Sequence, residues 1–553
     1  MNGVLLKYDG VAVGSNEKII EVESSSMEKF STPLDVVKRK DYENIANPTD
    51  LYSVSLSGKV SAIPQNSKYE TLGVWSEEQS SIDGKFSTPI KMTLKADAYF
   101  SSVGVTLVFD EYRNIFANKV KIIWFRDDQK LEEATFYPDF YEYFYGKSVE
   151  LFNRVDIVFY SINAPKSRLR IQTIAFGKSF EISSRMLKNS IITQKIDPIS
   201  ATVPISTLDF SVVFDDDIDV LFQKKQTIEA NFNKKIKGTF FIKKAQKTGK
   251  NSFSVSCEDY IGLLDSVFFE GGLYEDASAY VVAQEICEKV GARISFPNEF
   301  KNRKITGRIP RTTCRKALQQ ILFALQLFAD TSNSRKIVAK TIDKTTYNIP
   351  RERIMQGVKT SDKEIITGVE VVAHIYKPTQ EEVVLYDGSQ SGAGEDIELI
   401  FDEPHTHFVL ENGNFKSISE NRVVFDATDK TLLKGKKVRH ITKTKTKKNT
   451  QIQFGEEENI KRIDGATLVN PQNIDIVLDN CYNYLVKNKT VSAKIVEGKH
   501  ENIDGDGYFY DFPIEPGMKL NVDVAFDDNF VGNVESQSFR MNGGILVKEC
   551  ILK

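Results

Sequence analysis

The residues best suited to metal chemistry lie in two short stretches. His405 and His407 stand one residue apart among acidic neighbours, and two imidazoles at this spacing on one strand face can bind zinc. Because a third ligand does not follow nearby, we prefer an edge strand without a metal. Residues 502–513 begin like a calcium loop, but Pro513 occupies the position where an EF-hand needs a bidentate Glu. We interpret that stretch as a tight turn, and we expect no metal ion.

A strongly basic stretch is the main candidate for binding phosphate. Residues 430–448 contain nine Lys or Arg residues and no acidic residue. Strand alternation would place Lys443, Lys445 and Lys447 on one face, where they could contact DNA. The alternative, which we prefer, is a solvated strand or a contact with the acidic cluster 456–458 of a partner chain.

Enzyme motifs are missing from the sequence. The chain has five His residues and no G-x-S-x-G, H-E-x-x-H or P-loop pattern. Two carboxylates across a cleft, as sugar hydrolysis requires, cannot be recognised among 76 acidic residues. The widely spaced cysteines favour reduced, buried thiols; they are Cys257, Cys287, Cys314, Cys481 and Cys550. We therefore expect a protein that is not an enzyme, with no catalytic residue and no cofactor.

The composition is that of a multidomain globular protein. A length of 553 residues predicts about three to five domains. Apolar residues make up 41% and charged residues 27%, which argues against extensive disorder. A net charge of −3 gives no sign of a dedicated nucleic-acid binder. The first residues lack a signal-peptide pattern, and no apolar run reaches ~18 residues. We expect synthesis in a cytoplasm and no membrane span.

The elements that would position these residues begin with β structure. We expect an N-terminal arm with short strands over 1–63 and a β-sandwich over 64–182. Each strand has one apolar face to bury, which two packed sheets achieve. The alternating strands are Gly104–Asp110, Lys119–Phe125, Arg154–Ile162 and Leu169–Gly177.

The order of elements in this sandwich, with Trp75, Phe86 and Pro89 ahead of the strands, resembles a discoidin-type jelly roll. The resemblance implies a fold common among carbohydrate-binding modules, with its last two strands paired. Exposed aromatic faces could stack on sugar rings, and we prefer core, hairpin or inter-subunit contacts for them. The aromatics concerned are Tyr137, Tyr141, Tyr143 and Tyr145.

Residues 183–268 contain three phrases that resemble a known family. Pro204–Phe210 reads P-x-x-T-L-x-F, Gly238–Ile242 reads G-T-F-F-I, and Asp259–Asp265 reads D-x-I-G-L-L-D. These phrases resemble the first β-barrel of baseplate or tail-tip hub proteins from Firmicute prophages and phage-tail-like particles. The resemblance implies a hub β-barrel over 183–268, and Leu263 and Leu264 would close its mouth.

An α/β insert is expected over 269–345, with two amphipathic helices. The first covers 277–290, with Asp276 as N-cap and Gly291 as C-cap. The second covers 313–329, and the strand Lys336–Ile342 follows it.

Residues 346–553 are expected to form a second hub barrel region with a helix over 474–487. Within this region, Tyr386–Asp396 is rich in Gly, Ser and acidic residues and predicts a loop. The predicted fold class is mainly β with an α+β insert.

The resemblance implies a structural function. Hub proteins of this family are homotrimers, and two barrels per chain give a pseudo-sixfold ring between the tail tube and the spike. We therefore expect a component of a virion, a tail-like bacteriocin or another contractile injection system, located at the baseplate or tail tip. The sandwich precedes the hub-like part, so we expect it on the outer rim, against peripheral baseplate or fibre proteins. The alternatives are a carbohydrate-binding tail adhesin and a tail-associated cell-wall hydrolase.

Overall fold

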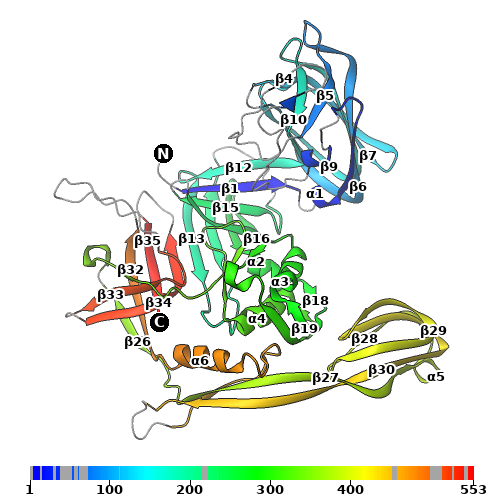
Figure 1. Cartoon of the computed structure of the whole chain (residues 1–553). Helices are drawn as coiled ribbons and strands as arrows, with labels where there is room; N and C mark the ends of the chain where they lie inside the picture. The colour runs from blue at the N-terminus through cyan, green and yellow to red at the C-terminus, as the bar shows by residue number, and fades with distance from the viewer. Residues whose placement is uncertain are drawn as a thin grey trace. The chain divides into compact units, whose positions relative to one another are not determined.

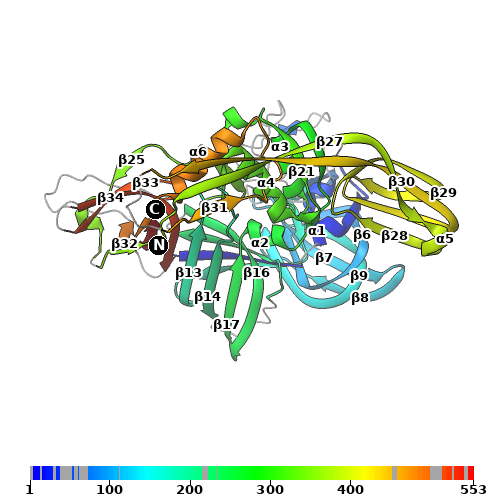
Figure 2. The same cartoon turned by 90° about the horizontal axis from the view of Figure 1, so that it is seen from below.

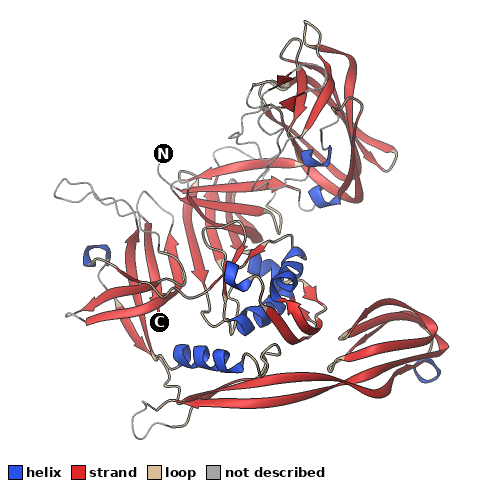
Figure 3. Cartoon of the chain, viewed as in Figure 1, coloured by secondary structure: helices blue, strands red, loops and turns tan. Residues whose placement is uncertain are grey.

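The chain folds into two compact units. The computed structural model describes residues 4–12, 15–28, 31, 33–37, 53–54, 60–61, 73–110, 113–214, 222–232, 235–355, 357–450, 457–497, 514–525, 528–540 and 546–553. The N-terminal unit comprises Lys7–Glu181 and Asp219–Gln226, and the main unit comprises Met1–Leu6, Ile182–Ile218 and Thr227–Lys553. Both units consist mainly of antiparallel strands (Figure 3), so the mainly-β fold class is confirmed.

The N-terminal unit is built on a six-stranded sheet in the order β11-β6-β9-β7-β8, with β2 paired to β6. Its strands are β2 Ile19–Ser24, β6 Lys85–Val108, β7 Ala117–Arg126, β8 Gln129–Phe136, β9 Glu142–Ile162 and β11 Thr173–Ala175. A smaller sheet pairs β5 (Val74–Gln79) with β10 (Arg168–Ile171). The expected pairing of the last two strands is wrong, because the run Leu169–Gly177 is divided at Gln172 and its halves join different sheets.

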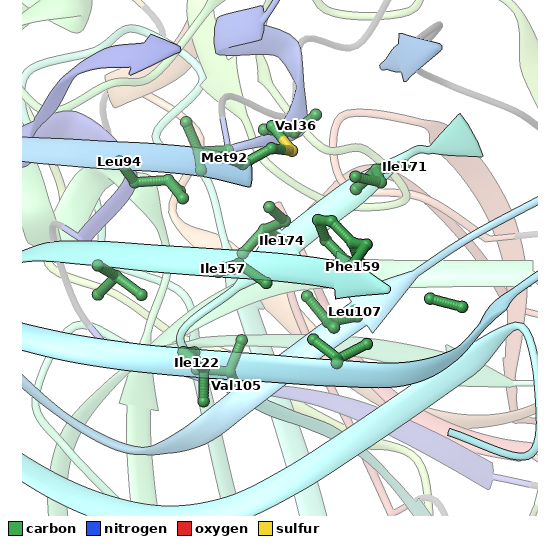
Figure 4. Packing of buried hydrophobic residues seen from close by; sticks show 14 of the residues in the cluster. Val36, Met92, Leu94, Val105, Leu107, Ile122, Ile157, Phe159, Ile171 and Ile174 are labelled. Carbon is green, nitrogen blue, oxygen red and sulfur yellow. The ribbon is translucent and has the colours of Figure 1, made fainter. Parts of the chain in front are cut away.

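Alternating apolar residues of this sheet form one buried core (Figure 4). Leu107 of β6, Ile122 of β7 and Phe159 of β9 are completely buried in it. Burying one such side chain stabilises a fold by roughly 1.5–3 kcal/mol. Val36, from the short helix η1 (Pro33–Val36), packs into the same core. Part of the stretch expected as a separate arm therefore belongs to the sandwich.

Nine strands of the main unit form one sheet in the order β15-β16-β17-β14-β13-β34-β35-β32-β26. Their bounds are β13 Leu187–Lys195, β14 Thr207–Val213, β15 Thr227–Phe232, β16 Lys235–Gly249, β17 Ser252–Glu258, β26 Lys359–Asp362, β32 Lys489–Glu497, β34 Asp528–Arg540 and β35 Leu546–Leu552. The first half of β34 also pairs with β33 (Lys519–Ala525), which pairs with β25 (Thr346–Asn348).

The two β-barrels expected over 183–268 and 346–553 are not closed within the described strands, whose order is linear. The strands of the first region instead continue into those of the second. Antiparallel pairing of β13 with β34 makes this junction, and it sets Gln194 opposite Gln537. An open sheet edge of one region thus meets an open edge of the other, which satisfies the backbone groups of both.

A helical insert follows the first group of strands (Figure 1). Its helices are α2 Tyr260–Asp265, α3 Ala279–Glu288 and α4 Cys314–Leu325. The expected caps of the first helix are wrong. Ser278 is the N-cap, because its hydroxyl accepts from Val281 N, whereas Asp276 has a left-handed backbone (φ 50°). The helix ends at Glu288, before Gly291.

The second expected helix also ends early. Gln326 adopts a left-handed conformation (φ 57°) at its end, and Phe328 enters the strand β23 (Phe328–Asp330). Leu264 packs into the core of the insert rather than at a barrel mouth. The phrase Asp259–Asp265 therefore joins the first strands to the insert.

A long two-stranded ribbon is part of the main unit (Figures 1 and 2). It consists of β27 (Gly368–Asp387) and β30 (Arg422–Lys448), joined at its outer end by α5 (Gly388–Ser391), β28 (Gly394–Ile400) and β29 (His405–Ser419). We call the outer part, residues 380–437, the distal lobe. The loop expected over 386–396 is wrong. Asp387 caps α5 through Ser389 N, and Tyr386 is buried in a small core of the lobe.

At the inner end of the ribbon, α6 (Ile474–Leu485) packs on β27. Val369, Val371 and Ala373 of the strand meet Val477 and Cys481 of the helix in one buried cluster. The parallel strand β31 (Ile460–Ile463) pairs with the same part of β27. The expected helix 474–487 is therefore present, two residues shorter.

Candidate functional site

His405 and His407 do not form a metal site. His407 has a left-handed backbone (φ 52°), so the regular alternation that would align the two imidazoles is interrupted. Their Nδ1 atoms contact different partners, the carbonyl of Glu403 at 3.0 Å and the hydroxyl of Thr406 at 3.1 Å. Among the residues that the structure describes, no three His, Cys, Asp or Glu side chains gather around a cation position.

A different histidine pair, not singled out from the sequence, lies in the inner half of the ribbon. His374 Nδ1 lies 2.9 Å from His440 Nε2, and the ring of Tyr376 stacks on His440 with 4.6 Å between centroids. Burial lowers the pKa of His374. The only signal in the sequence was the spacing of His374 and Tyr376 on one strand face. The pairing with His440 depends on a register across the ribbon.

The basic stretch 430–448 lies along β30, and much of its charge is used within the chain. Lys445 Nζ lies 2.6 Å from Asp475, and Lys447 Nζ lies 2.6 Å from Asp479. Alternate residues of a strand and residues four apart on a helix have similar spacing, so the two pairs form in parallel. Lys447 also lies over the ring of Tyr482, at 4.6 Å.

Other cations of the stretch have partners as well. Lys434 pairs with Glu411, Lys437 pairs with Glu381, and Lys448 lies 3.7 Å from Glu458 of the same chain. The positive charge of this stretch is therefore partly neutralised within the chain. Its geometry adds no support for DNA binding.

Asp259 is a buried carboxylate at the connection between the first strands of the main unit and the insert. It accepts hydrogen bonds from Ile261 N, Ser206 N and the hydroxyl of Thr331, at 3.0, 3.1 and 2.6 Å. Burial nevertheless raises its pKa to about 6. One side chain thus caps α2 and links it to β14 and to the insert, which is a structural task.

A buried arginine ties the distal lobe to the insert. Arg308 donates to Asn421 Oδ1 at 2.8 Å and to the carbonyls of Asp402 and Phe401 at 2.6 and 3.1 Å. Asn421, fully buried, donates in turn to the carbonyl of Ile309 at 2.9 Å. These bonds fix the turns at the base of the lobe, and no local sequence pattern predicts them.

The tyrosines proposed for sugar stacking differ in exposure. Tyr143 and Tyr145 stack against Phe136, with 5.6 and 4.5 Å between centroids, and pack on the core. Tyr137 is 64% exposed and Phe140 is 50% exposed. Tyr141 is half-buried, packs on the core and lies against Phe140, with 4.4 Å between ring centroids.

The remaining expectations concern the cysteines, a membrane span and the turn over 502–513. All five cysteines are buried and unbridged, as predicted. None of the helices in the described ranges has the length and apolar character needed to span a bilayer. The stretch 502–513, expected to be a tight turn, lies outside the described residues.

Comparison with known proteins gives matches among solved structures. No family model and no curated protein matches the sequence. A tail protein from Neisseria meningitidis MC58 matches with 12% identity and a TM-score of 0.41, over 68% of this chain and 94% of that one. The 43 kDa tail protein of prophage MuSo2 from Shewanella oneidensis matches with 8% identity and a TM-score of 0.40, over 68% and 95%. Prophage tail protein gp18 from Listeria monocytogenes EGD-e matches with 7% identity and a TM-score of 0.36, over 67% and 91%.

Proposed function

We propose that the chain is a structural tail protein of a phage or phage-tail-like particle, acting as the hub at its baseplate or tail tip. The single observation behind the proposal is the junction of β13 with β34, which joins two groups of strands in one sheet. In the hub family that the sequence resembles, two β domains per chain are repeated in a trimer. Two groups of strands in each of three chains would supply six similar positions for a sixfold tube.

The positions of the family-like phrases support the same proposal. Pro204–Phe210 leads into β14, Gly238–Ile242 lies within β16, and Asp259–Asp265 forms the cap and body of α2. The three phrases therefore belong to one sheet and to its connection with the insert. They are structural elements, so their resemblance to hub proteins concerns the framework of the main unit.

The proposal includes partners and location. The main unit would form a homotrimeric ring in contact with the tail tube and the spike. The N-terminal unit would contact peripheral baseplate or fibre proteins. The chain would be made in the cytoplasm of the bacterial host, become part of the particle and have no catalytic activity.

The test is removal of the protein from a producing bacterium. Deleting its gene should abolish complete tails in electron micrographs, and the full chain supplied in trans should restore them. Tails of normal length and tip structure without this chain would reject the structural proposal. Clear lysis in a peptidoglycan zymogram of the purified chain would reject the claim that it has no catalytic activity.

A carbohydrate-binding adhesin is the second candidate, favoured by the exposed rings of Tyr137 and Phe140. Cell-wall pull-down with the full chain should then fall at least tenfold in the double variant Tyr137→Ala/Phe140→Ala. Ile82→Ala, at a side chain 79% exposed in the same unit, is the matched control. Absence of binding at millimolar sugar, or equal binding by all three proteins, would leave the tail role alone.

A further inference from the structure

Helix α6 presents three faces with different chemistry. Ile474, Val477, Leu478 and Cys481 are buried, and Asp475 and Asp479 pair with β30. The third face, at alternating spacings of three and four residues, holds Ile476, Asn480 and Asn483, with Asn473 just before the helix and Lys487 two residues after its end. Residues at these spacings form one stripe along a helix. We call it the amide stripe.

The amide stripe has no structural task that explains it. Asn is a weak helix former, so repeating it along one face disfavours the helix. Asn473 caps the local turn through Asn470 N, but Asn480 and Asn483 are exposed and their side chains make no hydrogen bond to any residue in the described ranges. Along the stripe, Ile476 lies between Asn473 and Asn480, and its side chain is 63% exposed.

The stripe forms one wall of a pocket of 540 Å³ in the main unit. The other walls come from the end of α4, the segment before β21 (Lys304–Ile309) and the segment after β24 (Ile337–Lys340). Apolar atoms of Leu325 and Ile342 contribute to the lining. The volume falls in the range of pockets that bind ligands, roughly 300–1,000 Å³.

The charge in this pocket has one sign. Its lining includes Arg303, Lys304, Lys344 and Lys487, and no acidic residue among those described. None of the four forms an ion pair with a described residue. Burial and the nearby Lys519 lower the pKa of Lys487, and Glu535 acts in the opposite direction. A concave surface lined by one sign of charge attracts the opposite charge.

A second hollow of 630 Å³ adjoins the first and shares Thr341, Ile342 and Lys344 with it. Its lining includes the carboxylates Glu299, Asp343 and Glu515, the last of which pairs with Lys340 at 3.2 Å. A nucleic-acid strand, negative at every phosphate, would meet repulsion as soon as it passed Lys344. A peptide can be acidic over a few residues and neutral or basic afterwards.

We propose that the amide-lined pocket binds an extended acidic segment of another protein. The cations would pair with its carboxylates, and the side-chain amides of Asn480 and Asn483 would hydrogen-bond its backbone. An apolar side chain of the segment would contact Ile476 and Leu325. The inference uses only the chemistry of the pocket, so it is independent of the proposed tail function.

The test is fluorescence anisotropy with the full chain and a labelled twelve-residue probe of Glu with interspersed Leu. We expect saturable binding that weakens with salt, and at least tenfold weaker binding of a probe with Gln in place of Glu. The variant Asn480→Asp/Asn483→Asp adds two negative charges without changing side-chain size. It should weaken binding at least tenfold, and Lys344→Glu, on another wall, should do the same.

Lys316→Glu is the matched control, since it reverses an exposed charge on α4 outside the pocket and should leave binding within twofold. Thermal unfolding of each variant shows whether it is folded. Failure of both pocket variants to weaken binding, or no binding of the acidic probe, overturns the proposal. Tighter binding of a twelve-nucleotide thymidine oligomer than of the peptide also overturns it, in favour of a nucleic-acid site.

Discussion

Gln537 Nε2 donates a hydrogen bond to Gln194 Oε1 at 2.6 Å, between two strands that lie 343 residues apart in the sequence. Both side chains are buried, and Gln194 also donates to the carbonyl of Lys237 at 2.6 Å. The bond lies in the β13–β34 junction, where the first and last strand groups of the main unit become one sheet. Because another register would break these bonds between buried amides, the pair favours one register of this pairing.

The first prediction concerns this amide pair. Gln537→Ala should lower the free energy of unfolding by roughly 1–3 kcal/mol, because it leaves buried Gln194 without its partner. Urea denaturation of the full chain measures the change. Gln246→Ala, at an exposed position of β16, should stay within about 0.5 kcal/mol. Equal effects of the two substitutions would mean that the junction is not specified by the pair.

The second prediction concerns the pH dependence due to Asp259. Its pKa is about 6 in the folded chain and 3.8 as the ordinary value, so the folded state holds the proton more tightly. The stability it contributes is therefore complete below about pH 4 and is lost as the pH rises through about 6. Relative to Asp259→Asn, the wild type should lose about 2–3 kcal/mol between pH 4 and pH 7. A difference between the two proteins that stays constant over this range would contradict the assignment.

The third prediction concerns the attachment of the distal lobe. Arg308→Ala removes three hydrogen bonds at the base of the lobe. Amide hydrogen exchange should become faster in 394–437 and stay unchanged in β13–β17. Lys301→Ala, an exposed cation of the same insert, is the control. Unchanged exchange in the lobe of the Arg308 variant would show that the lobe is held by other contacts.

The fourth prediction concerns the ion pairs between β30 and α6. Lys447 and Asp479 are more than a third exposed, so their pair contributes less than about 1 kcal/mol. Asp479→Lys should lower the unfolding midpoint slightly at low salt, and adding Lys447→Asp should recover it. Both effects should disappear near 1 M salt, where the Debye length is about 3 Å. A loss that persists in high salt would point to packing rather than charge.

Local patterns predicted much of this fold and long-range pairing accounts for the rest. The alternation in Lys119–Phe125 and the apolar stripe of 474–487 identified β7 and α6, since one buried face decides each. The sequence of 386–396, rich in Gly, Ser and acidic residues, predicted a loop. Instead, burial of Tyr386 and the N-cap at Asp387 give this segment regular structure.

The residues of the candidate sites depend on long-range pairing rather than on local patterns. Asn480 and Asn483 line a pocket only because α4 and the segment after β24 form the walls opposite them. His374 meets His440 only because β27 and β30 pair in one register. Neither arrangement follows from spacing within a single element, so the sequence alone did not predict them.

The central claim is that this chain forms a hub ring in a tail. Cryo-electron microscopy of the assembled particle, with the chain located by an affinity label, tests it most directly. We predict three copies in one ring at the tail tip, contacting the tube on one side and the spike on the other. A single copy, or a position without contact to tube or spike, would contradict the account.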